Sequence, residues 1–495
     1  MRLVFGRLRS FSLIGLILLT LLANQKVLGA RKDSEASIQY FEDQIPRICP
    51  EDLPRAIEKI VNRPQFKRSL WGIEIQTLGS GDSLYSLNGD KFFTPASSAK
   101  LLTTAAALSE LGADYRITTP IYAVGNPPHL TSLRIKGQGD PTISTKELKN
   151  LVHQLQRQGI KEIEELIVDD SYFDSPTINP TWEWLDVHSY FATAVNSTIL
   201  NQNTVTLTLL PQQLGQPVKF RWSDAIAARQ WQVINKAITG ESDLPYNVEI
   251  DGDLGKPTLL IRGELAQNEP PDIWDLAIVD PAHYFLESLR LHLAQAGIAV
   301  NKGFTFNQTH KNELETELTA ITSPPLPKIL QQINQESNNL FAEAIAKILA
   351  KKLNTKTPIE AINQSLTKLG IDPEEYILID ASGLSRQNLI TPQTLVKTLK
   401  IMSRSPEAEY YRESLAIAGV NGTLKNRFRN TSVSRKLWGK TGTLTGVVTL
   451  SGYIYPSQYP TIAFSILLNN SEISNREIRQ AIDEIVVIIN HLNKC

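Results

Sequence analysis

The sequence predicts an α/β (α+β) fold in which helices flank one antiparallel sheet that is assembled from both ends of the chain. Near the N-terminus, residues 71–78 and 83–87 alternate apolar and polar side chains around a turn, which is typical of a β-hairpin. Near the C-terminus, residues 447–455 and 461–468 are β-branched and aromatic runs separated by a turn with two prolines. The long segment between these ends consists mainly of short strand patterns separated by Gly, Asp and Pro. We therefore expect it to be a large β-rich insertion.

Helices are expected beside both pairs of strands. Residues 98–111 are rich in Ala and Leu, contain no Gly or Pro, and end before Gly112. At the other end of the chain, residues 475–492 are amphipathic. A helix next to each pair of strands suits a sheet that is covered by helices.

Short strands punctuated by Gly, Asp and Pro characterise the middle of the chain, at residues 133–141, 166–170 and 204–209. Residues 284–296 are expected to form a helix, and residues 298–306 to return the chain to the first domain.

These boundaries predict a main domain and an insertion. The main domain is expected to comprise residues 30–115 and 300–495, and the inserted β-rich region residues 116–299. Within the insertion we expect two subdomains, which are residues 116–203 together with 272–299, and residues 204–271.

The first thirty residues have the layout of a signal peptide. Three arginines precede an uncharged apolar run over residues 11–23, and the small residues Gly29 and Ala30 follow it. This run is shorter than the ~20 residues that a membrane-spanning helix needs. We therefore expect residues 1–29 to be a cleaved signal peptide and the protein to be exported to the periplasm (cell envelope), with loose membrane association possible. An uncleaved membrane anchor is the alternative.

Cys49 and Cys495 are the only cysteines in the sequence. Export would place both where disulfides persist, and a bridge between them would tie the ends of the mature chain together. The alternative is two unrelated thiols. Neither cysteine stands beside a histidine-bearing motif, so neither is expected to be catalytic.

The charge balance argues against a nucleic-acid partner, because 50 Lys and Arg face 51 Asp and Glu. The seven histidines form no His-Glu-x-x-His or similar spacing, so a zinc peptidase is poorly supported. We expect no metal and no cofactor.

Ser97 and Lys100 form a pair suited to nucleophilic catalysis. A serine hydroxyl must lose its proton to a nearby base, and a lysine three residues later lies one helical turn away. At the start of a helix, Ser97 would also meet unpaired N–H groups that favour an oxyanion. The tetrad alone is weak evidence, because Ser365-Leu366-Thr367-Lys368 repeats it inside an amphipathic stretch, where a solvated helix face explains it.

Two further motifs support a catalytic role for the tetrad that begins at Ser97. Lys440-Thr441-Gly442-Thr443 immediately precedes the strand expected over residues 447–455, where the glycine allows close approach and the lysine and threonines could bind a carboxylate. Ser337-Asn338-Asn339 opens a helical run over residues 340–353, although by itself it could be an ordinary N-cap. These three motifs, in this order, are the signature of penicillin-binding proteins and class A β-lactamases, here with Asn338 in place of Asp.

With these motifs the sequence resembles the penicillin-binding protein 4 type of D-alanyl-D-alanine carboxypeptidase/endopeptidase, which are low-molecular-mass class C penicillin-binding proteins of peptidase family S13. The resemblance covers nearly the whole mature chain and implies a serine β-lactamase/DD-peptidase-like fold. The long separation of Ser97 from Ser337 fits, because this family has a large insertion there. Further blocks that carry the resemblance are Gly139-Asp140-Pro141, residues 168–173, Trp182-Glu183-Trp184 and residues 380–386.

The resemblance implies that Ser97 attacks the penultimate D-alanine carbonyl of a peptidoglycan stem peptide, with Lys100 as the base. An acyl-enzyme results, which water hydrolyses, and β-lactam antibiotics would be covalent inhibitors. The backbone N–H groups of Ser97 and Thr443 would form the oxyanion hole. Ser337 and Lys440 would carry the proton to the leaving amine.

Further roles for binding the substrate follow from the same resemblance. Asn339 would bind the substrate amide, and the edge formed by Thr441, Gly442 and Thr443 would hold the terminal carboxylate. Asp186 and Arg386 would contact diaminopimelate, whose side chain bears one charge of each sign, or would form a surface ion pair instead.

The sequence departs from the family pattern at two positions. Ala381 replaces a usual glycine, and Thr445 stands where a longer polar residue can contact the substrate.

Two other functions are the alternatives. A β-lactamase would need a deacylating carboxylate, and no Glu-containing motif stands beside the three signature motifs. A non-catalytic β-lactam sensor or cell-wall-binding module could keep the fold, but the intact Ser97, Lys100 and Lys440 argue against it.

Overall fold

The computed structural model describes residues 37–253, 256–307 and 314–495. The expected signal peptide over residues 1–29, or the alternative membrane anchor, lies outside the described residues. Within the described ranges, no helix combines the length and the apolar character needed to span a membrane.

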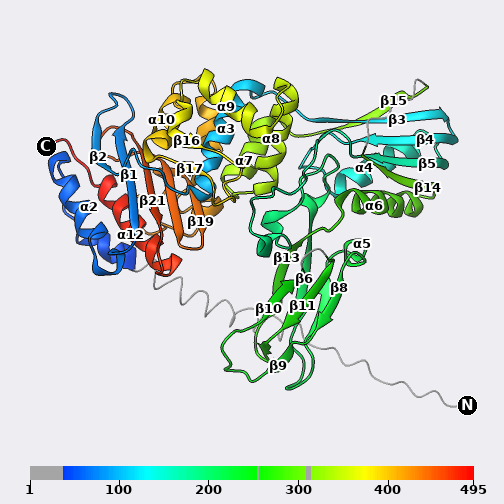
Figure 1. Ribbon diagram of the computed structural model, residues 1–495, viewed down its shortest axis with the longest axis horizontal. Helices are drawn as coiled ribbons and strands as arrows, with labels where there is room; N and C mark the ends of the chain where they lie inside the picture. Colours follow the sequence, from blue (N-terminus) through cyan, green and yellow to red (C-terminus); the bar gives the residue numbers. More distant parts are fainter. Residues whose placement is uncertain (1–36, 254–255, 308–313) are drawn as a thin grey trace, which may run out of the picture.

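A six-stranded antiparallel sheet forms the centre of the main domain, in the order β18-β19-β20-β21-β1-β2 (Figure 1). Strand β1 pairs with β21 from Leu70–Asn469 to Thr77–Ile462, so the two ends of the chain meet in the middle of the sheet. The prediction of one sheet assembled from both ends is confirmed. The strands are β1 (Leu70–Thr77), β2 (Ser83–Leu87), β18 (Ala416–Ile417), β19 (Leu437–Leu444), β20 (Val447–Ile454) and β21 (Ile462–Asn469).

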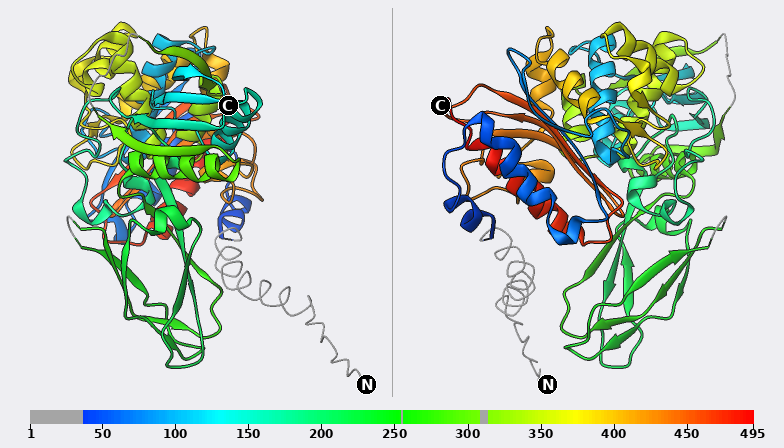
Figure 2. Two further views of the ribbon diagram at one scale, coloured as in Figure 1. Left: turned by 90° about the vertical axis from the view of Figure 1, so that its right-hand side faces the viewer. Right: turned by 60° about the vertical axis from the view of Figure 1, so that its left-hand side comes forward.

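Helices cover both faces of this sheet (Figure 2). On one face lie α2 (Leu53–Val61) and α12 (Asn475–Asn490), which pack on apolar side chains of the sheet. Because both faces are covered, β20 and β21 are buried along their whole length. The other face carries α3 (Lys100–Leu111), α7 (Leu326–Asn334), α8 (Asn339–Leu353), α9 (Pro358–Lys368), α10 (Pro392–Met402) and α11 (Ala408–Glu413).

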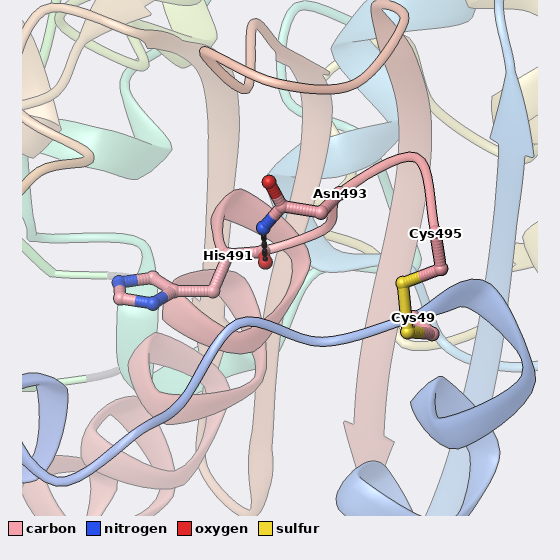
Figure 3. Close-up of a disulfide and its surroundings, with 4 residues drawn as sticks. All are labelled: Cys49, His491, Asn493 and Cys495. Carbon is pink, nitrogen blue, oxygen red and sulfur yellow. Dashed lines mark hydrogen bonds between the residues drawn. A yellow bond between two sulfur atoms is a disulfide. The ribbon is translucent and has the colours of Figure 1, made fainter.

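A disulfide between Cys49 and Cys495 joins the two ends of the main domain (Figure 3). The backbone supports it, because the N–H of Ile48 donates to the carbonyl of His491 at 3.1 Å and the N–H of Asn493 donates to the carbonyl of Ile48 at 3.0 Å. The pairing expected from the sequence is thus present in the structure.

The insertion contains a five-stranded sheet in the order β14-β5-β4-β3-β15, with α4 (Thr145–Arg157) and α6 (Pro281–Gln295) packed on its core (Figure 1). In this mixed sheet, β4 and β14 run parallel to β5 on either side of it. The strands are β3 (Thr118–Asn126), β4 (His129–Lys136), β5 (Glu162–Asp169), β14 (Ala299–Phe306) and β15 (Thr316–Thr322).

The expected return to the main domain at residue 300 is wrong. Strand β14 pairs in parallel with β5, and β15 pairs with β3, so strand pairing inside the insertion continues to Thr322. The physical reason is α6, which leads into β14 and provides the helical crossover that a parallel strand needs.

Short strands form the lower part of the insertion in Figure 1, in the sheets β13-β6-β7, β10-β11-β8 and β12-β9. We expected this part to end at residue 271, but β13 pairs with β6 and therefore belongs to it. Trp274 and Leu276 of β13 pack in the same core as Leu207 of β6, which explains the pairing. The elements are β6 (Thr204–Leu210), β7 (Lys219–Trp222), α5 (Ala225–Ala228), β8 (Gln232–Asn235), β9 (Ile238–Gly240), β10 (Glu249–Gly252), β11 (Thr258–Arg262), β12 (Glu264–Ala266) and β13 (Asp272–Ala277).

Candidate active site

Ser97 lies in a 3-10 turn, η3 (Ala96–Ala99), that leads directly into α3. The turn packs against strand β19 at Gly442. A Cβ atom at this glycine would lie 2.9 Å from the backbone nitrogen of Ser97 and 2.3 Å from Oγ1 of Thr449. Glycine is therefore what allows the strand to approach the backbone of Ser97 so closely.

The side-chain nitrogen of Lys100 lies among three oxygens. They are Oγ of Ser97 at 2.9 Å, Oδ1 of Asn339 at 2.6 Å and the carbonyl oxygen of Ser382 at 2.5 Å. A neutral amine has two hydrogens, and the amide and carbonyl oxygens can only accept. With both hydrogens donated to these oxygens, the nitrogen lone pair faces the Ser97 hydroxyl.

The electrostatics of Lys100 suit the same role. The residue is fully buried, and burial lowers its pKa to about 7, while the charges of Asp380 and Glu343 act in the opposite direction. A substantial fraction of the free amine is therefore present near neutral pH. A base with such a pKa can accept the proton of a serine hydroxyl.

Ser337 and Lys440 form a second pair of hydroxyl and amine. Nζ of Lys440 donates to Oγ of Ser337 at 2.8 Å and to the carbonyl of Thr441 at 2.7 Å. Burial, followed by the charge of Lys100, holds the pKa of Lys440 well below its ordinary value. Ser337 has a φ of +60° and immediately precedes Asn338, the N-cap of α8.

The insertion reaches this site through the Ser-Asn-Asn motif. Nδ2 of Asn339 donates to the carbonyl of Phe191 at 2.8 Å, and Nδ2 of Asn338 donates to Oε1 of Gln202 at 2.7 Å. The first bond fixes the Asn339 amide so that its oxygen faces Lys100.

Strand β19 holds the Lys-Thr-Gly motif and presents an open edge. Strand β18 pairs only with Trp438 and Gly439 of β19, so among the described strands none pairs with residues 440–444 on that side. We expected the motif just ahead of the strand over residues 447–455, whereas it lies in a strand of its own. The two strands form a hairpin closed at Leu444 and Val447, and the φ of +71° at Gly446 permits so short a turn.

The two threonines of this motif contact neighbouring polar groups. Oγ1 of Thr441 donates to Oγ1 of Thr423 at 2.8 Å, and Nη2 of Arg479 on α12 donates to Oγ1 of Thr443 at 3.3 Å. Arg479 was not predicted from the sequence.

Asp186 and Arg386 lie in one neighbourhood but are not hydrogen-bonded to each other. Arg386 instead donates to Oε1 of Glu183 at 2.6 Å and to the carbonyl of Thr445 at 3.1 Å. Asp186 ends η4 (Trp184–Asp186), and its pKa is raised by burial and by the charge of Glu183, while Arg386 acts to lower it. Arg386 therefore forms its surface ion pair with Glu183.

The second Ser-x-x-Lys tetrad is arranged differently. We expected it on a solvated face, but Ser365 is fully buried, and its Oγ donates to the carbonyl of Ala361 at 2.8 Å within α9. Burial follows because α9 packs against α3 and α8. Lys368 is exposed and pairs with Glu110 at 2.7 Å.

Two buried carboxylates of the site were also missed. Oε1 of Glu343 accepts from the backbone N–H groups of Ala381 and Ser382, and Asp380 accepts from the N–H groups of Gly383 and Ser385. One signal was present for Glu343, which is a lone acid in an apolar helical run, four residues after Asn339. Within the described ranges, no group of three or more His, Cys, Asp or Glu is placed to hold a metal ion.

Known proteins are similar to this chain in both sequence and architecture. Residues 53–491 match the model of the D-Ala-D-Ala carboxypeptidase 3 (S13) family. The D-alanyl-D-alanine carboxypeptidase of Actinomadura sp. (strain R39) is 30% identical over 444 residues, which cover 84% of this chain and 81% of that protein. D-alanyl-D-alanine carboxypeptidase DacB of Haemophilus influenzae is 26% identical over 411 residues, 80% of this chain and 85% of that protein.

Among solved structures, penicillin binding protein 4 (dacB) from Haemophilus influenzae superposes with a TM-score of 0.78 at 24% identity. The match covers 88% of this chain and 98% of that one, and it shows that the fold is shared across the main domain and the insertion. The family match spans the same two parts and contains all three signature motifs. The chain therefore belongs to the D-Ala-D-Ala carboxypeptidase 3 (S13) family.

Proposed function

We propose that this chain is a serine-type D-Ala-D-Ala carboxypeptidase that removes the terminal D-alanine from peptidoglycan stem peptides through an acyl-enzyme on Ser97. The observation that carries the proposal is the 2.9 Å contact between Nζ of Lys100 and Oγ of Ser97 in a chain of this family. The same reaction on a cross-linked peptide is a DD-endopeptidase reaction, and we propose that either peptide binds along the open edge of β19.

Acylation uses the two pairs of hydroxyl and amine in turn. Lys100 takes the proton of Ser97, and Oγ attacks the carbonyl carbon of the penultimate D-alanine. The backbone N–H groups of Ser97 and Thr443 stabilise the oxyanion. Ser337 and Lys440 relay the proton that Lys100 took to the amine of the departing D-alanine, which completes cleavage of the peptide bond and leaves Lys100 neutral again. Water then attacks the ester as Lys100 accepts its proton, and Lys100 returns this proton to Oγ of Ser97 as the ester bond breaks.

The substrate binds as an added strand along residues 440–444. The hydroxyl groups of Thr441 and Thr443 hold its terminal carboxylate, and the guanidinium of Arg479 beside Thr443 adds a positive charge there. Asn339 contacts the substrate amide through the side chain that also faces Lys100.

For a diaminopimelate side chain, Arg386 offers a cation and Asp186 an anion, with Glu183 holding Arg386 in place. These two residues therefore carry the proposed substrate preference.

A β-lactamase is disfavoured by the same geometry. The one carboxylate of α8 near Lys100, Glu343, uses Oε1 to accept from the backbone N–H groups of Ala381 and Ser382, which assigns it to this loop rather than to a deacylating water. We therefore expect β-lactams to acylate Ser97 and to remain bound as inhibitors.

The proposed location is the periplasm (cell envelope). The Cys49–Cys495 disulfide supports export, because such bonds persist in oxidising compartments. For the domains, the strand pairing supports an insertion of residues 116–322 in a main domain that resumes at α7.

Fluorescent penicillin tests the nucleophile. The purified protein should be labelled covalently, Ser97→Ala should abolish the label, and Ser365→Ala should retain it as the matched control. Labelling that survives Ser97→Ala would place the acyl-enzyme elsewhere.

Mass spectrometry of digested muropeptides tests the reaction. Loss of a terminal D-alanine identifies the carboxypeptidase, and conversion of dimers to monomers identifies the endopeptidase. If the labelled protein changes neither, the proposed function is wrong.

A further inference from the structure

The loop of residues 380–385 forms one wall of the Lys100 site, and two buried carboxylates shape it. Its Ser382 carbonyl accepts from Nζ of Lys100 at 2.5 Å. Oε1 of Glu343 accepts from the backbone N–H of Ala381 at 2.9 Å and from that of Ser382 at 2.8 Å. Asp380 secures the following residues by accepting from the N–H of Gly383 at 2.7 Å and from that of Ser385 at 2.6 Å.

Residues of helix α8 help to position both oxygens that accept hydrogen bonds from Lys100. Asn339, the first residue of the helix, supplies one oxygen directly at 2.6 Å. Glu343 lies one turn later on the same side of the helix. It holds the N–H of Ala381 and the peptide group on the N-terminal side of Ser382, while Asp380 accepts from the N–H of Gly383 in the peptide group that contains the Ser382 carbonyl. The two carboxylates therefore position this carbonyl from its two sides.

We propose that Glu343 is a positioning residue for acylation, which fixes the Ser382 carbonyl and thereby directs the lone pair of Lys100 toward the Ser97 hydroxyl. The inference rests on the proposed function, because it concerns the transfer of the Ser97 proton to Lys100. Without the bonds from Glu343, the loop is held on only one side of the Ser382 carbonyl, by Asp380. The carbonyl can then shift relative to Lys100, which weakens one of the two acceptors that set the orientation of the amine.

The chemistry of the position supports this role over simple packing. Glu343 is only 8% exposed, and burying a carboxylate costs free energy that an apolar side chain would not. Burial, followed by the charge of Asp380, raises the pKa of Glu343 to about 8, while the hydrogen bonds from Ser382 and the charge of Lys100 act to lower it.

The charged groups around Glu343 come from three elements. Lys100 on α3, Asp380 on the loop and Lys347 on α8 interact with it electrostatically, and Lys440 on β19 interacts with Lys100. Because the pKa of Glu343 is raised to about 8, its carboxyl group is largely neutral in the pH range where Lys100, with a pKa of about 7, titrates. A neutral glutamine at this position should therefore leave the acid limb of acylation near that of the wild type.

Two substitutions separate position from charge. Glu343→Gln keeps the length of the side chain and an oxygen that can accept from the loop, whereas Glu343→Ala removes both the acceptor and the charge. We would measure the second-order rate of acylation by fluorescent penicillin between about pH 5.5 and 9. Circular dichroism and thermal unfolding would show that each variant is folded.

We expect Glu343→Ala to lower the plateau rate by about 10- to 100-fold, within the range that a general base contributes. We expect Glu343→Gln to stay within about threefold of the wild-type plateau, because its side-chain oxygen can still accept from the loop. Glu360→Gln, an exposed acid on α9, is the control and should leave rate and profile unchanged.

The inference is overturned if folded Glu343→Ala keeps the wild-type plateau, or if Glu343→Gln, which keeps the acceptor, loses as much of the plateau rate as Glu343→Ala. If Glu343→Ala does not fold, Glu343→Met, which keeps most of the volume but has no acceptor for the loop, decides by the same comparison. Failure of the proposed function would look different, because the wild type itself would then escape labelling or Ser97→Ala would still be labelled.

Discussion

Two buried lysines lie within one site, and each faces a serine hydroxyl. Lys100 and Lys440 are both fully buried, and each bonds to a serine, Ser97 and Ser337 respectively. Burying an ammonium group is costly, and two neighbouring positive charges repel each other. Burial accordingly lowers the pKa of both lysines, and for Lys440 the charge of Lys100 lowers it further. Neutral amines can thus exchange protons with the hydroxyl groups that they face.

The titration of Lys100 sets an expected pH profile for the wild type. Its pKa of about 7 means that the free amine predominates above that value and the ammonium form below it. Only the free amine can accept the Ser97 proton, so the rate of acylation should fall as the pH decreases through about 7. Measuring the rate of penicillin labelling against pH checks this, with circular dichroism at each pH as the control for unfolding. A rate that stays constant from about pH 8 to 6 would contradict it.

At the scale of secondary-structure elements, sequence patterns predicted the helices and hairpins that form between residues close together in the chain. The hairpin of β1 and β2, the helix after Ser97 and the helix that Ser337-Asn338-Asn339 opens all follow from alternation, composition and capping. The pairing of β14 with β5 could not be predicted from the sequence, because it depends on which strand edge is unpaired once the rest of the insertion has folded.

The same distinction applies inside the site. The three motifs could be found from the sequence, because each is a short run of residues. The partners of Lys100 and Arg386 come from distant segments, so Ser382, Glu343 and Glu183 were not predicted as their neighbours.

A buried ion triad joins three parts of the insertion. Nη1 of Arg134 on β4 donates to Asp169 of β5 at 2.7 Å, and its Nε donates to Glu315, just before β15, at 3.0 Å. Arg134→Met should destabilise the protein by about 3–5 kcal/mol, because it leaves two buried carboxylates unpaired. Denaturant unfolding measures this change.

The matched control for Arg134 is Arg68→Met, which removes an exposed pair with Glu472 and should cost less than about 1 kcal/mol. Equal effects of the two substitutions would show that the triad does not hold the sheet together.

At the scale of the whole molecule, the two ends of the chain close one domain around a long insertion. β1 and β21 pair in the sheet centre, and α2 and α12 cover one face together (Figure 2). A disulfide joins Cys49, which precedes α2, to Cys495, which follows α12. Ser97 precedes α3, which packs in the helical layer on the opposite face. Apart from Arg479 in the first turns of α12, which contacts Thr443, the closure of the chain and the residues of the site are therefore on different sides of the sheet.

This separation predicts that the disulfide contributes to stability and not to acylation. The bridge spans 446 residues, so it restricts the unfolded chain strongly, and a Cys49→Ser, Cys495→Ser double variant should lose about 2–5 kcal/mol. Thermal unfolding should show a lower midpoint for this variant than for the oxidised wild type. Reductant should lower the midpoint of the wild type alone, which controls for effects of the substitutions themselves. Well below the midpoint, penicillin should label both proteins at the same rate, since Ser97, Lys100 and their partners are untouched. A slower rate in the folded variant would mean that closing the chain also sets the geometry of the site.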